Sequence, residues 1–123
     1  MSNCIIVDDS ATVRHVVRRM LDSMGLEVEE AEDGQRALDA CRKRMPDLIL
    51  LDWNMPVMDG LTFLKHLRRL PAGQQPKVIF CTTVNDLPHI EEALDAGADE
   101  YIMKPFDEAI IRAKLHQTGF LEA

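Results

Sequence analysis

The chain of 123 residues has few cysteines, fewer positively than negatively charged residues, and no long hydrophobic run. Its three cysteines are an odd number without the spacing of metal ligands, which argues against a cysteine metal site and favours a reduced, cytoplasmic protein. Lys and Arg number 14 against 21 Asp and Glu, and the net charge of -7 argues against a nucleic-acid partner, whose binding requires cationic patches. No apolar stretch is long enough to span a membrane, and we expect no signal peptide because polar residues interrupt the N-terminus by Asp8.

Strand-like and helix-like patterns alternate five times along the chain. Short apolar or alternating runs predict strands over residues 3–7, 27–31, 47–51, 77–81 and 100–103. Apolar residues at helical spacing predict a helix between a Ser10 cap and Gly25, and further helices over residues 35–45, 61–70, 88–96 and 107–118. Such alternation is typical of an α/β fold with a doubly wound parallel sheet, and we expect one domain over residues 1–123 without an output domain.

Three carboxylates stand where predicted strands end. Asp8 and Asp9 follow residues 3–7, and Asp52 follows residues 47–51. Parallel strands place such ends on one edge of the sheet, where ligands bind in this class of fold. Like charges about 5 Å apart repel by roughly 3 kcal/mol per pair at an effective dielectric of about 20, so we expect a cation to neutralise the group.

Two further residues belong to the same predicted edge. Thr82 follows the strand at residues 77–81, and Lys104 follows the strand at residues 100–103. Mg²⁺ suits an all-oxygen site of this kind, and the three acids, Lys104 and Mg²⁺ have formal charges that sum to zero. If Asp52 accepts a phosphoryl group, the added oxygens can bind Mg²⁺, Lys104 and Thr82 together, which is the arrangement that phosphoryl transfer requires.

Taken together, these residues resemble the motif set of response-regulator receiver domains, and most of all the stand-alone, chemotaxis-type (CheY-like) members. The likeness covers the whole chain and is carried by residues 7–10, residues 51–56, Asp59-Gly60, Thr82 and residues 104–106. It implies a flavodoxin-like fold with five helices and the strand order 2-1-3-4-5, which is taken from the family. It also implies a signalling switch rather than an enzyme, one that catalyses only its own phosphoryl transfer and slow dephosphorylation.

The resemblance assigns a role to each acid. Asp52 would be the phosphoacceptor and would receive its phosphoryl group from a histidine kinase or phosphotransfer protein. Asp9 and Asp52 would bind Mg²⁺ directly, together with the backbone carbonyl of Asn54. Asp8 would hold the ion mostly through water.

The remaining members of the motif set would respond to the phosphoryl group. Lys104 would bind one of its oxygens, and Thr82 would move to donate a hydrogen bond to another. Tyr101 matches the aromatic switch residue that turns inward when Thr82 moves. The family also implies a cis peptide bond between Lys104 and Pro105, which is affordable only before proline.

Signal output would then depend on another protein. The family's usual output face is formed by the predicted helix 88–96, strand 100–103 and helix 107–118. The candidate contact residues on this face are Asp86, Leu87, His89, Tyr101 and Lys114. We expect a monomer or a weak phosphorylation-dependent dimer, and motility, cell-cycle control and stress signalling all stay open as pathways.

Two residues depart from the family's pattern. Thr83 stands beside the phosphoryl pocket where a small residue such as alanine is usual. Val84 stands where members that hydrolyse fast often carry a polar or acidic residue. Because Val84 cannot orient a water molecule, we expect unassisted dephosphorylation to be slow.

Three other functions are weaker. A small phosphatase with an aspartyl-phosphate intermediate usually carries a second acid two residues after the nucleophile, and this position is Asn54. A flavin-binding domain needs a phosphate loop after the first strand, where Asp8 and Asp9 would repel phosphate. A constitutive adaptor of receiver fold would not require the complete set of acids, hydroxyl and lysine.

Several conspicuous side chains receive purely structural interpretations. Trp53 is expected to be a partly exposed loop residue. Solvated helix faces are expected for the basic clusters Arg14/Arg18/Arg19, Arg42-Lys43-Arg44 and Arg68-Arg69. We expect surface positions for the histidines, none of which has the spacing of metal ligands: His15, His66, His89 and His116.

Overall fold

The structure, a computed structural model, describes residues 2–83 and 87–121. The strands are β1 (Asn3–Val7), β2 (Glu27–Ala31), β3 (Leu48–Leu51), β4 (Lys77–Thr82) and β5 (Glu100–Met103). The helices within the described residues are α1 (Ala11–Asp22), α2 (Gly34–Lys43), α3 (Gly60–Arg69), α4 (Leu87–Asp95) and α5 (Glu108–Gln117). All strand pairs are parallel, and the sheet order is β2-β1-β3-β4-β5, as the family resemblance implied.

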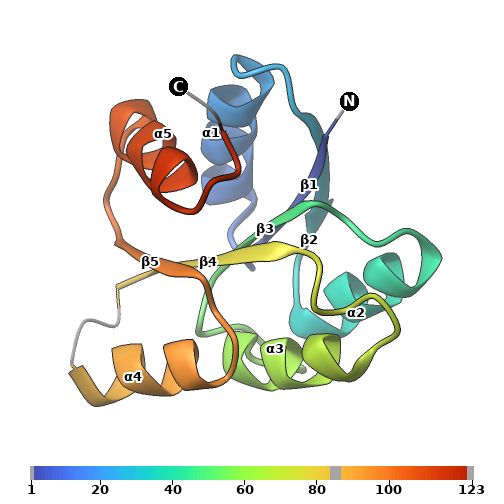
Figure 1. Ribbon diagram of the computed structural model, residues 1–123. Coiled ribbons are helices and arrows are strands. Elements are labelled where there is room, and N and C mark those ends of the chain that lie inside the picture. The colour runs from blue at the N-terminus through green and yellow to red at the C-terminus, as the bar shows by residue number, and fades with distance from the viewer. Residues whose placement is uncertain (1, 84–86, 122–123) are drawn as a thin grey trace.

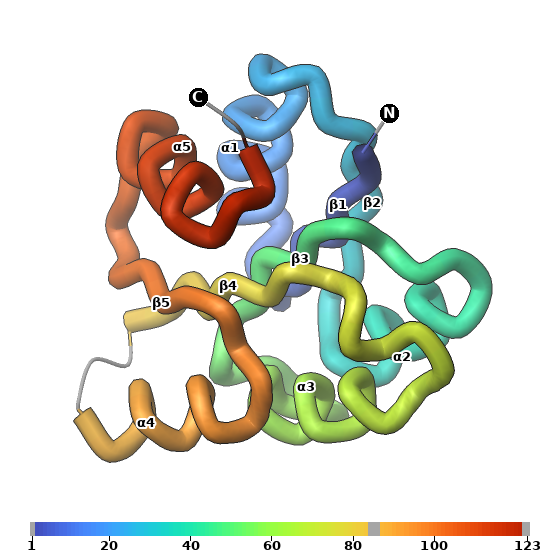
Figure 2. Tube along the Cα trace, in the orientation of Figure 1, coloured from blue at the N-terminus to red at the C-terminus, as the bar shows by residue number. Residues whose placement is uncertain are grey.

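The sheet separates two helical layers. Figure 1 shows α1 and α5 on one face and α2, α3 and α4 on the other, and the tube in Figure 2 follows the same path. Successive strand residues point to opposite faces, so Ile5 and Val7 pack with α2, α3 and α4, while Cys4 and Ile6 pack with α1 and α5. Both faces of the central strands are buried, which explains why these strands are continuous apolar runs rather than alternating ones.

Polar side chains begin four of the helices. Ser10, which the sequence predicted as a cap, and Asp59 and Asp107 accept hydrogen bonds from backbone N–H groups in the first turns of α1, α3 and α5. Asp33 does the same for α2, and this cap was not predicted. Gly25 has a φ of 80°, a left-handed conformation that lets the chain turn from α1 into β2.

Three apolar residues that follow the helical spacing of the sequence are exposed rather than buried. Leu94 of α4 is 45% exposed, Ile110 of α5 is 42% exposed and Val16 of α1 is 46% exposed. The neighbouring residues Ala93 and Ile111 are fully buried in their place. Each helix lies against the sheet along a narrow stripe, and consecutive residues differ by about 100° around the helix axis, so only one of each pair reaches the core.

Arg68 corrects the expectation that the basic clusters are solvated. Its side chain on α3 is only 10% exposed. It donates to the carbonyl oxygens of Gly97, Gly73 and Pro76, with donor–acceptor distances from 2.6 to 3.1 Å. Arg68 therefore ties the loop before β4 and the end of α4 to α3.

No helix of the described ranges 2–83 and 87–121 combines the length and apolarity that a membrane span needs.

Candidate functional site

The predicted acidic cluster is present at the carboxyl edge of the sheet. Asp8 follows β1 and Asp52 follows β3, and the preceding residues Val7 and Leu51 are partners in the register of these parallel strands. One carboxylate oxygen each from Asp8, Asp9 and Asp52 lies within 4.8 Å of the other two. The short separation follows from strand pairing, since both chains leave the sheet at the same level.

Asp8 is built firmly into the fold. It is 4% exposed, and its backbone N–H donates to the Ala31 carbonyl at 3.1 Å. Its Oδ1 accepts from the Ser10 N–H at 2.9 Å, and its Oδ2 accepts from Lys104 Nζ at 2.6 Å. Asp9 is exposed. The cluster therefore combines a buried carboxylate, with a hydrogen bond to each oxygen, and one that is open to solvent.

Asp52 lies between these two extremes. Its side chain is 12% exposed, its Oδ1 accepts from the Trp53 N–H at 2.8 Å, and its Oδ2 lies 3.5 Å from Lys104 Nζ. Burial raises the pKa of Asp52, the charge of Lys104 opposes that rise, and the charge of Asp8 adds to it, with a raised pKa as the net result. An ionised Asp52 in the metal-free protein is consequently a destabilised anion.

Lys104 supplies positive charge to the cluster. Burial disfavours its charged form, but the hydrogen bond to Asp8 and the charges of Asp52 and Asp8 outweigh burial and raise its pKa. Three carboxylates and one ammonium leave a formal charge of -2, which a single divalent cation balances. Carboxylate oxygens are the donors that Mg²⁺ prefers, so the residues present fit this ion. The peptide bond between Lys104 and Pro105 is cis, as the resemblance implied.

The other predicted site residues surround the cluster. Thr82 is the last residue of β4 rather than the first residue after it, and it is 1% exposed. Its carbonyl accepts from the Lys104 N–H at 3.0 Å, which joins the ends of β4 and β5. Asn54 and Asp9 line one hollow beside the cluster, and the proposed ligation by the Asn54 carbonyl stays a prediction. Tyr101 is 9% exposed, with its ring centroid 6.4 Å from that of Phe80.

Trp53 is not the exposed loop residue that the sequence suggested. It is 7% exposed, with its ring centroid 5.0 Å from that of Phe80 and 5.2 Å from that of His89. His89 is accordingly half-buried against an aromatic ring rather than a plain surface histidine. A signal was available, because Leu51 and Trp53 continue the two-residue alternation of β3 past its end and belong to the same core cluster.

Arg14 is a site residue that sequence reasoning missed. Its Nη1 donates to the Asp8 carbonyl at 2.7 Å, and its Nε donates to Glu30 Oε1 at 3.0 Å. The side chain is 15% exposed, so the expectation of a solvated basic cluster is wrong here as well. Its place four residues after Ser10, on the first turns of a helix that starts beside the acids, was the only available signal.

Comparison with known proteins identifies the family. The family model of the response regulator receiver domain matches residues 4–116. The chain belongs to this family. The receiver is 35% identical to the chemotaxis protein CheY of Bacillus subtilis (strain 168), covering 93% of this chain and 94% of that protein. It is 39% identical to the KDP operon transcriptional regulatory protein KdpE of Escherichia coli (strain K12), covering 94% of this chain but only 50% of KdpE.

The fold of the receiver agrees with this assignment. A crystal structure of the Vibrio cholerae chemotaxis protein CheY4 superposes with a TM-score of 0.91 at 33% identity, covering 96% of this chain and 98% of that chain. This receiver is therefore a CheY-like response regulator domain of two-component systems.

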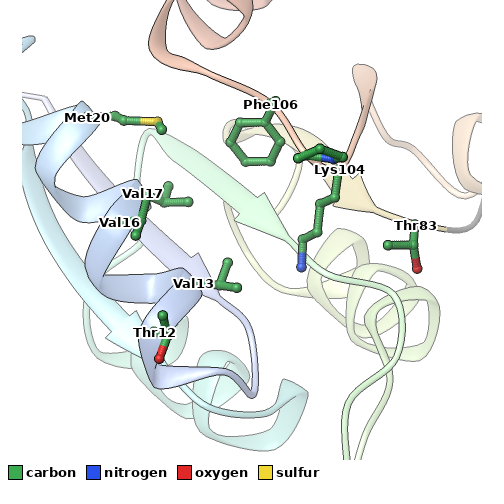
Figure 3. Close-up of a pocket in the computed structure, with 9 residues that line it drawn as sticks. Thr12, Val13, Val16, Val17, Met20, Thr83, Lys104 and Phe106 are labelled. Carbon is green, nitrogen blue, oxygen red and sulfur yellow. The ribbon is translucent and has the colours of Figure 1, made fainter.

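An apolar groove of about 400 Å³ opens beside the acidic cluster of the receiver. Figure 3 shows Lys104 and Phe106 on one side, facing a row of side chains on α1. That row consists of Thr12, Val13, Val16, Val17 and Met20. The row explains why Val16 is exposed although it follows the helical apolar pattern, because one side of α1 is apolar beyond the stripe that covers the sheet.

The residues predicted for the output face of the receiver differ in accessibility. Leu87 is 64% exposed, and Met103 of β5, which was not predicted, is 37% exposed. Lys114 Nζ lies 3.5 Å from Glu100 Oε1, which holds it across α5 and β5. Two residues of the sequence predictions, Asp86 and Val84, lie outside the described residues. Output contacts through this face stay a prediction.

Proposed function

We propose that this receiver accepts a phosphoryl group on Asp52 from the phosphohistidine of a histidine kinase or phosphotransfer protein, with Mg²⁺ as the cofactor. The phosphorylated form would signal by binding a downstream protein in the cytoplasm. The observation that carries the proposal is the group of three carboxylates within 4.8 Å of one another with Lys104 Nζ 2.6 Å from Asp8 and 3.5 Å from Asp52.

In the proposed reaction, Asp52 is the nucleophile. One of its carboxylate oxygens attacks phosphorus, the bond from phosphorus to the imidazole nitrogen breaks, and that nitrogen keeps the electron pair. Lys104 lies close enough to Asp52 to pair with an oxygen of the transferred group. The Thr82 hydroxyl, buried at the end of β4, is the proposed donor to another oxygen.

The metal would be held by the residues that the cluster brings together. Asp9 and Asp52, with the backbone carbonyl of Asn54, are the proposed direct ligands, and Asp8 is the proposed ligand through water. When bound, Mg²⁺ would neutralise the negative charge that gathers on the transferring phosphoryl group. Asp8 already accepts a hydrogen bond from Lys104, which supports a role for Asp8 in binding the ion through water rather than directly.

A phosphorylated receiver would be a switch rather than a phosphatase. The residue two positions after Asp52 is Asn54, which cannot act as the acid or base that a phosphatase places there. Val84 offers no side chain that orients water, so self-dephosphorylation is expected to be slow. A phosphoryl group on Asp52 that turns over within seconds without a phosphatase would contradict this part of the proposal.

We assign one surface of the receiver to the phosphoryl donor and another to the downstream target. The donor must bring its phosphohistidine to Asp52, and the apolar groove between α1 and Phe106 is hollowed beside Lys104. The target would bind the face of α4, β5 and α5, where Leu87 and Met103 are exposed. The similarity to the Bacillus subtilis chemotaxis protein supports chemotaxis as the pathway.

Phosphorylation of purified protein tests the proposal. Acetyl phosphate with millimolar Mg²⁺ should add one phosphoryl group to the wild type by intact mass and none to Asp52→Ala. Asp39→Ala is the matched control, because Asp39 is an exposed aspartate on α2 and its loss should leave phosphorylation unchanged. The fluorescence of Trp53, the single tryptophan, should change with Mg²⁺ and again with acetyl phosphate.

Two results would refute parts of the proposal. A phosphoryl group that persists in Asp52→Ala would move the acceptor to another residue. Capture experiments should recover a partner only when beryllofluoride, which mimics the phosphoryl group, is present with Mg²⁺. A partner captured equally without beryllofluoride would favour a constitutive adaptor instead.

A further inference from the structure

The guanidinium of Arg14 connects the turn after β1 to the edge strand β2. Its Nη1 donates to the Asp8 carbonyl at 2.7 Å, while its Nε donates to Glu30 Oε1 at 3.0 Å. Guanidinium donors form a rigid planar fork, so two bonds made at once restrict where the Asp8 carbonyl lies relative to β2. With a side chain only 15% exposed, Arg14 is part of the packed structure rather than a solvated charge.

The carbonyl that Arg14 holds belongs to the peptide unit that joins Asp8 to Asp9. Because this unit is planar, restraining its oxygen also restrains the direction in which Asp9 leaves it. The N–H on the other side of Asp8 donates to the Ala31 carbonyl of β2 at 3.1 Å. The turn is thus tied to β2 twice, once directly and once through the link from Arg14 to Glu30.

We propose that Arg14 is a positioning residue, which holds the Asp8–Asp9 turn in the arrangement that binds the divalent cation. This inference rests on the proposed Mg²⁺-dependent function. Arg14 acts through the Asp8 carbonyl rather than on the ion. The effect of removing Arg14 on Mg²⁺ affinity distinguishes positioning from simple charge. Removing a cation near an anionic site tightens Mg²⁺ binding by Coulomb attraction, whereas losing the positioning weakens it.

Arg18 provides a matched control on the same helix. It lies one turn after Arg14, and its Nη1 donates to Glu30 Oε2 at 2.7 Å. Its Nη2 donates to the Val28 carbonyl at 3.0 Å, on β2 and away from the acidic cluster. Arg18→Gln therefore removes the same charge and a bond to the same carboxylate, but leaves the bond between Arg14 and Asp8 in place.

Mg²⁺ titration of the full chain by calorimetry tests the inference. Arg14→Gln should weaken Mg²⁺ binding roughly tenfold, the effect typical of residues that orient metal ligands. Arg18→Gln should bind Mg²⁺ as tightly as the wild type or more tightly. Arg14→Lys keeps the charge but cannot make both bonds in one plane, and it should also weaken binding.

Amide hydrogen exchange supplies a second readout that needs no metal. The Ser10 N–H donates to Asp8 Oδ1 at 2.9 Å across the same turn. In EDTA, its protection should fall at least several-fold in Arg14→Gln and stay unchanged in Arg18→Gln. Thermal unfolding in EDTA checks that both variants fold. If Arg14→Gln does not fold, Arg14→Lys takes its place in every comparison.

The possible outcomes separate this inference from the proposed function. Equal Mg²⁺ affinity in Arg14→Gln and Arg18→Gln would overturn the positioning role, and so would tighter binding in Arg14→Gln. A wild type that binds no Mg²⁺ would instead refute the proposed function. The Ser10 amide would then decide alone whether Arg14 holds the turn, with unchanged protection in Arg14→Gln overturning the inference.

Discussion

Asp52→Asn should stabilise the metal-free protein even though it removes the proposed phosphoacceptor. The carboxylate is 12% exposed, faces Asp8 and Asp9 within 4.8 Å, and has Lys104 Nζ at 3.5 Å. Asparagine has nearly the same shape, and its Oδ1 can accept the same hydrogen bond from the Trp53 N–H. The substitution therefore removes a charge with little change in packing.

The separations between charges set the size of the effect. At an effective dielectric of about 20, one repulsion across 4.8 Å amounts to about 3.5 kcal/mol, and the attraction to Lys104 across 3.5 Å to about 5 kcal/mol. Solvent screens the repulsion between Asp52 and the exposed Asp9, so that only the repulsion from Asp8 is counted. The attraction to Lys104 therefore exceeds the one unscreened repulsion, and the gain must come from removing the cost of burying the charge, the largest cause of the raised pKa of Asp52. We expect the free energy of unfolding to rise by about 1–2 kcal/mol.

The pH dependence follows from the direction of the pKa shift. Burial raises the pKa of Asp52, the charge of Lys104 opposes the rise, and the charge of Asp8 adds to it. Between the ordinary pKa of an aspartate and the raised value, the folded state binds more protons than the unfolded state, so stability falls as pH rises through that window. The advantage of Asp52→Asn should be complete above the raised pKa and absent below the ordinary pKa.

Urea unfolding in EDTA measures the difference. Saturating Mg²⁺ should reverse the order of the two proteins, because binding to the folded wild type stabilises it. Asp47→Asn is the matched control: it removes the same net charge at the far end of β1, where the Asp47 carboxylate accepts from the Asn3 N–H at 3.0 Å. The reasoning is refuted if Asp52→Asn is no more stable than the wild type in EDTA, or if Asp47→Asn gains as much.

Three further substitutions test the frame around the site by urea unfolding. Val57→Gly should stabilise by about 1 kcal/mol, because Val57 has a φ of 69°, where a β-branched residue is strained and glycine is not. Arg68→Met should cost roughly 3 kcal/mol, because the Gly97 carbonyl and two loop carbonyls lose their donor. Gly60→Ala should cost about 3 kcal/mol and lower phosphorylation by acetyl phosphate, because the added Cβ would overlap the Asp52 carbonyl.

Each of these changes has a control nearby in the chain. Val57→Ala keeps a Cβ and should gain less than glycine does. Arg69→Met alters the exposed neighbour of Arg68 and should stay within about 0.5 kcal/mol of the wild type. Thr62→Ala, in the exposed first turn of α3, should leave phosphorylation intact. Equal effects of a substitution and its control, or a fully stable Gly60→Ala, would count against the structural account.

Local patterns in the sequence predicted the secondary structure closely. The bounds of β1, β2 and β5 agree with the predicted ranges, and the helices differ by at most two residues at either end. The agreement has a physical cause, because apolar periodicity, capping side chains such as Ser10 and Asp107, and breakers such as Gly25 act within a few residues. Only the strand order and the cis bond before Pro105 came from the family rather than from the pattern.

The candidate site was largely predictable for a related reason. Asp8, Asp52, Thr82 and Lys104 each stand at the end of a strand, and a parallel sheet brings these ends to one edge whatever the details of packing. Which atoms meet there was not predictable. The 2.6 Å contact between Lys104 and Asp8 joins residues 96 positions apart, and no local pattern specifies it.

By itself, the sequence determined the elements of this receiver and the edge where its acids meet, while the choice of Asp52 as the proposed phosphoacceptor came from the family resemblance. The tertiary structure alone decided which groups the long side chains meet: Trp53 packs against Phe80, Arg68 binds loop carbonyls and Arg14 holds the Asp8 carbonyl. Each of these long side chains can reach several environments, and the choice depends on which cavities and unpaired carbonyls remain after helices and sheet have packed.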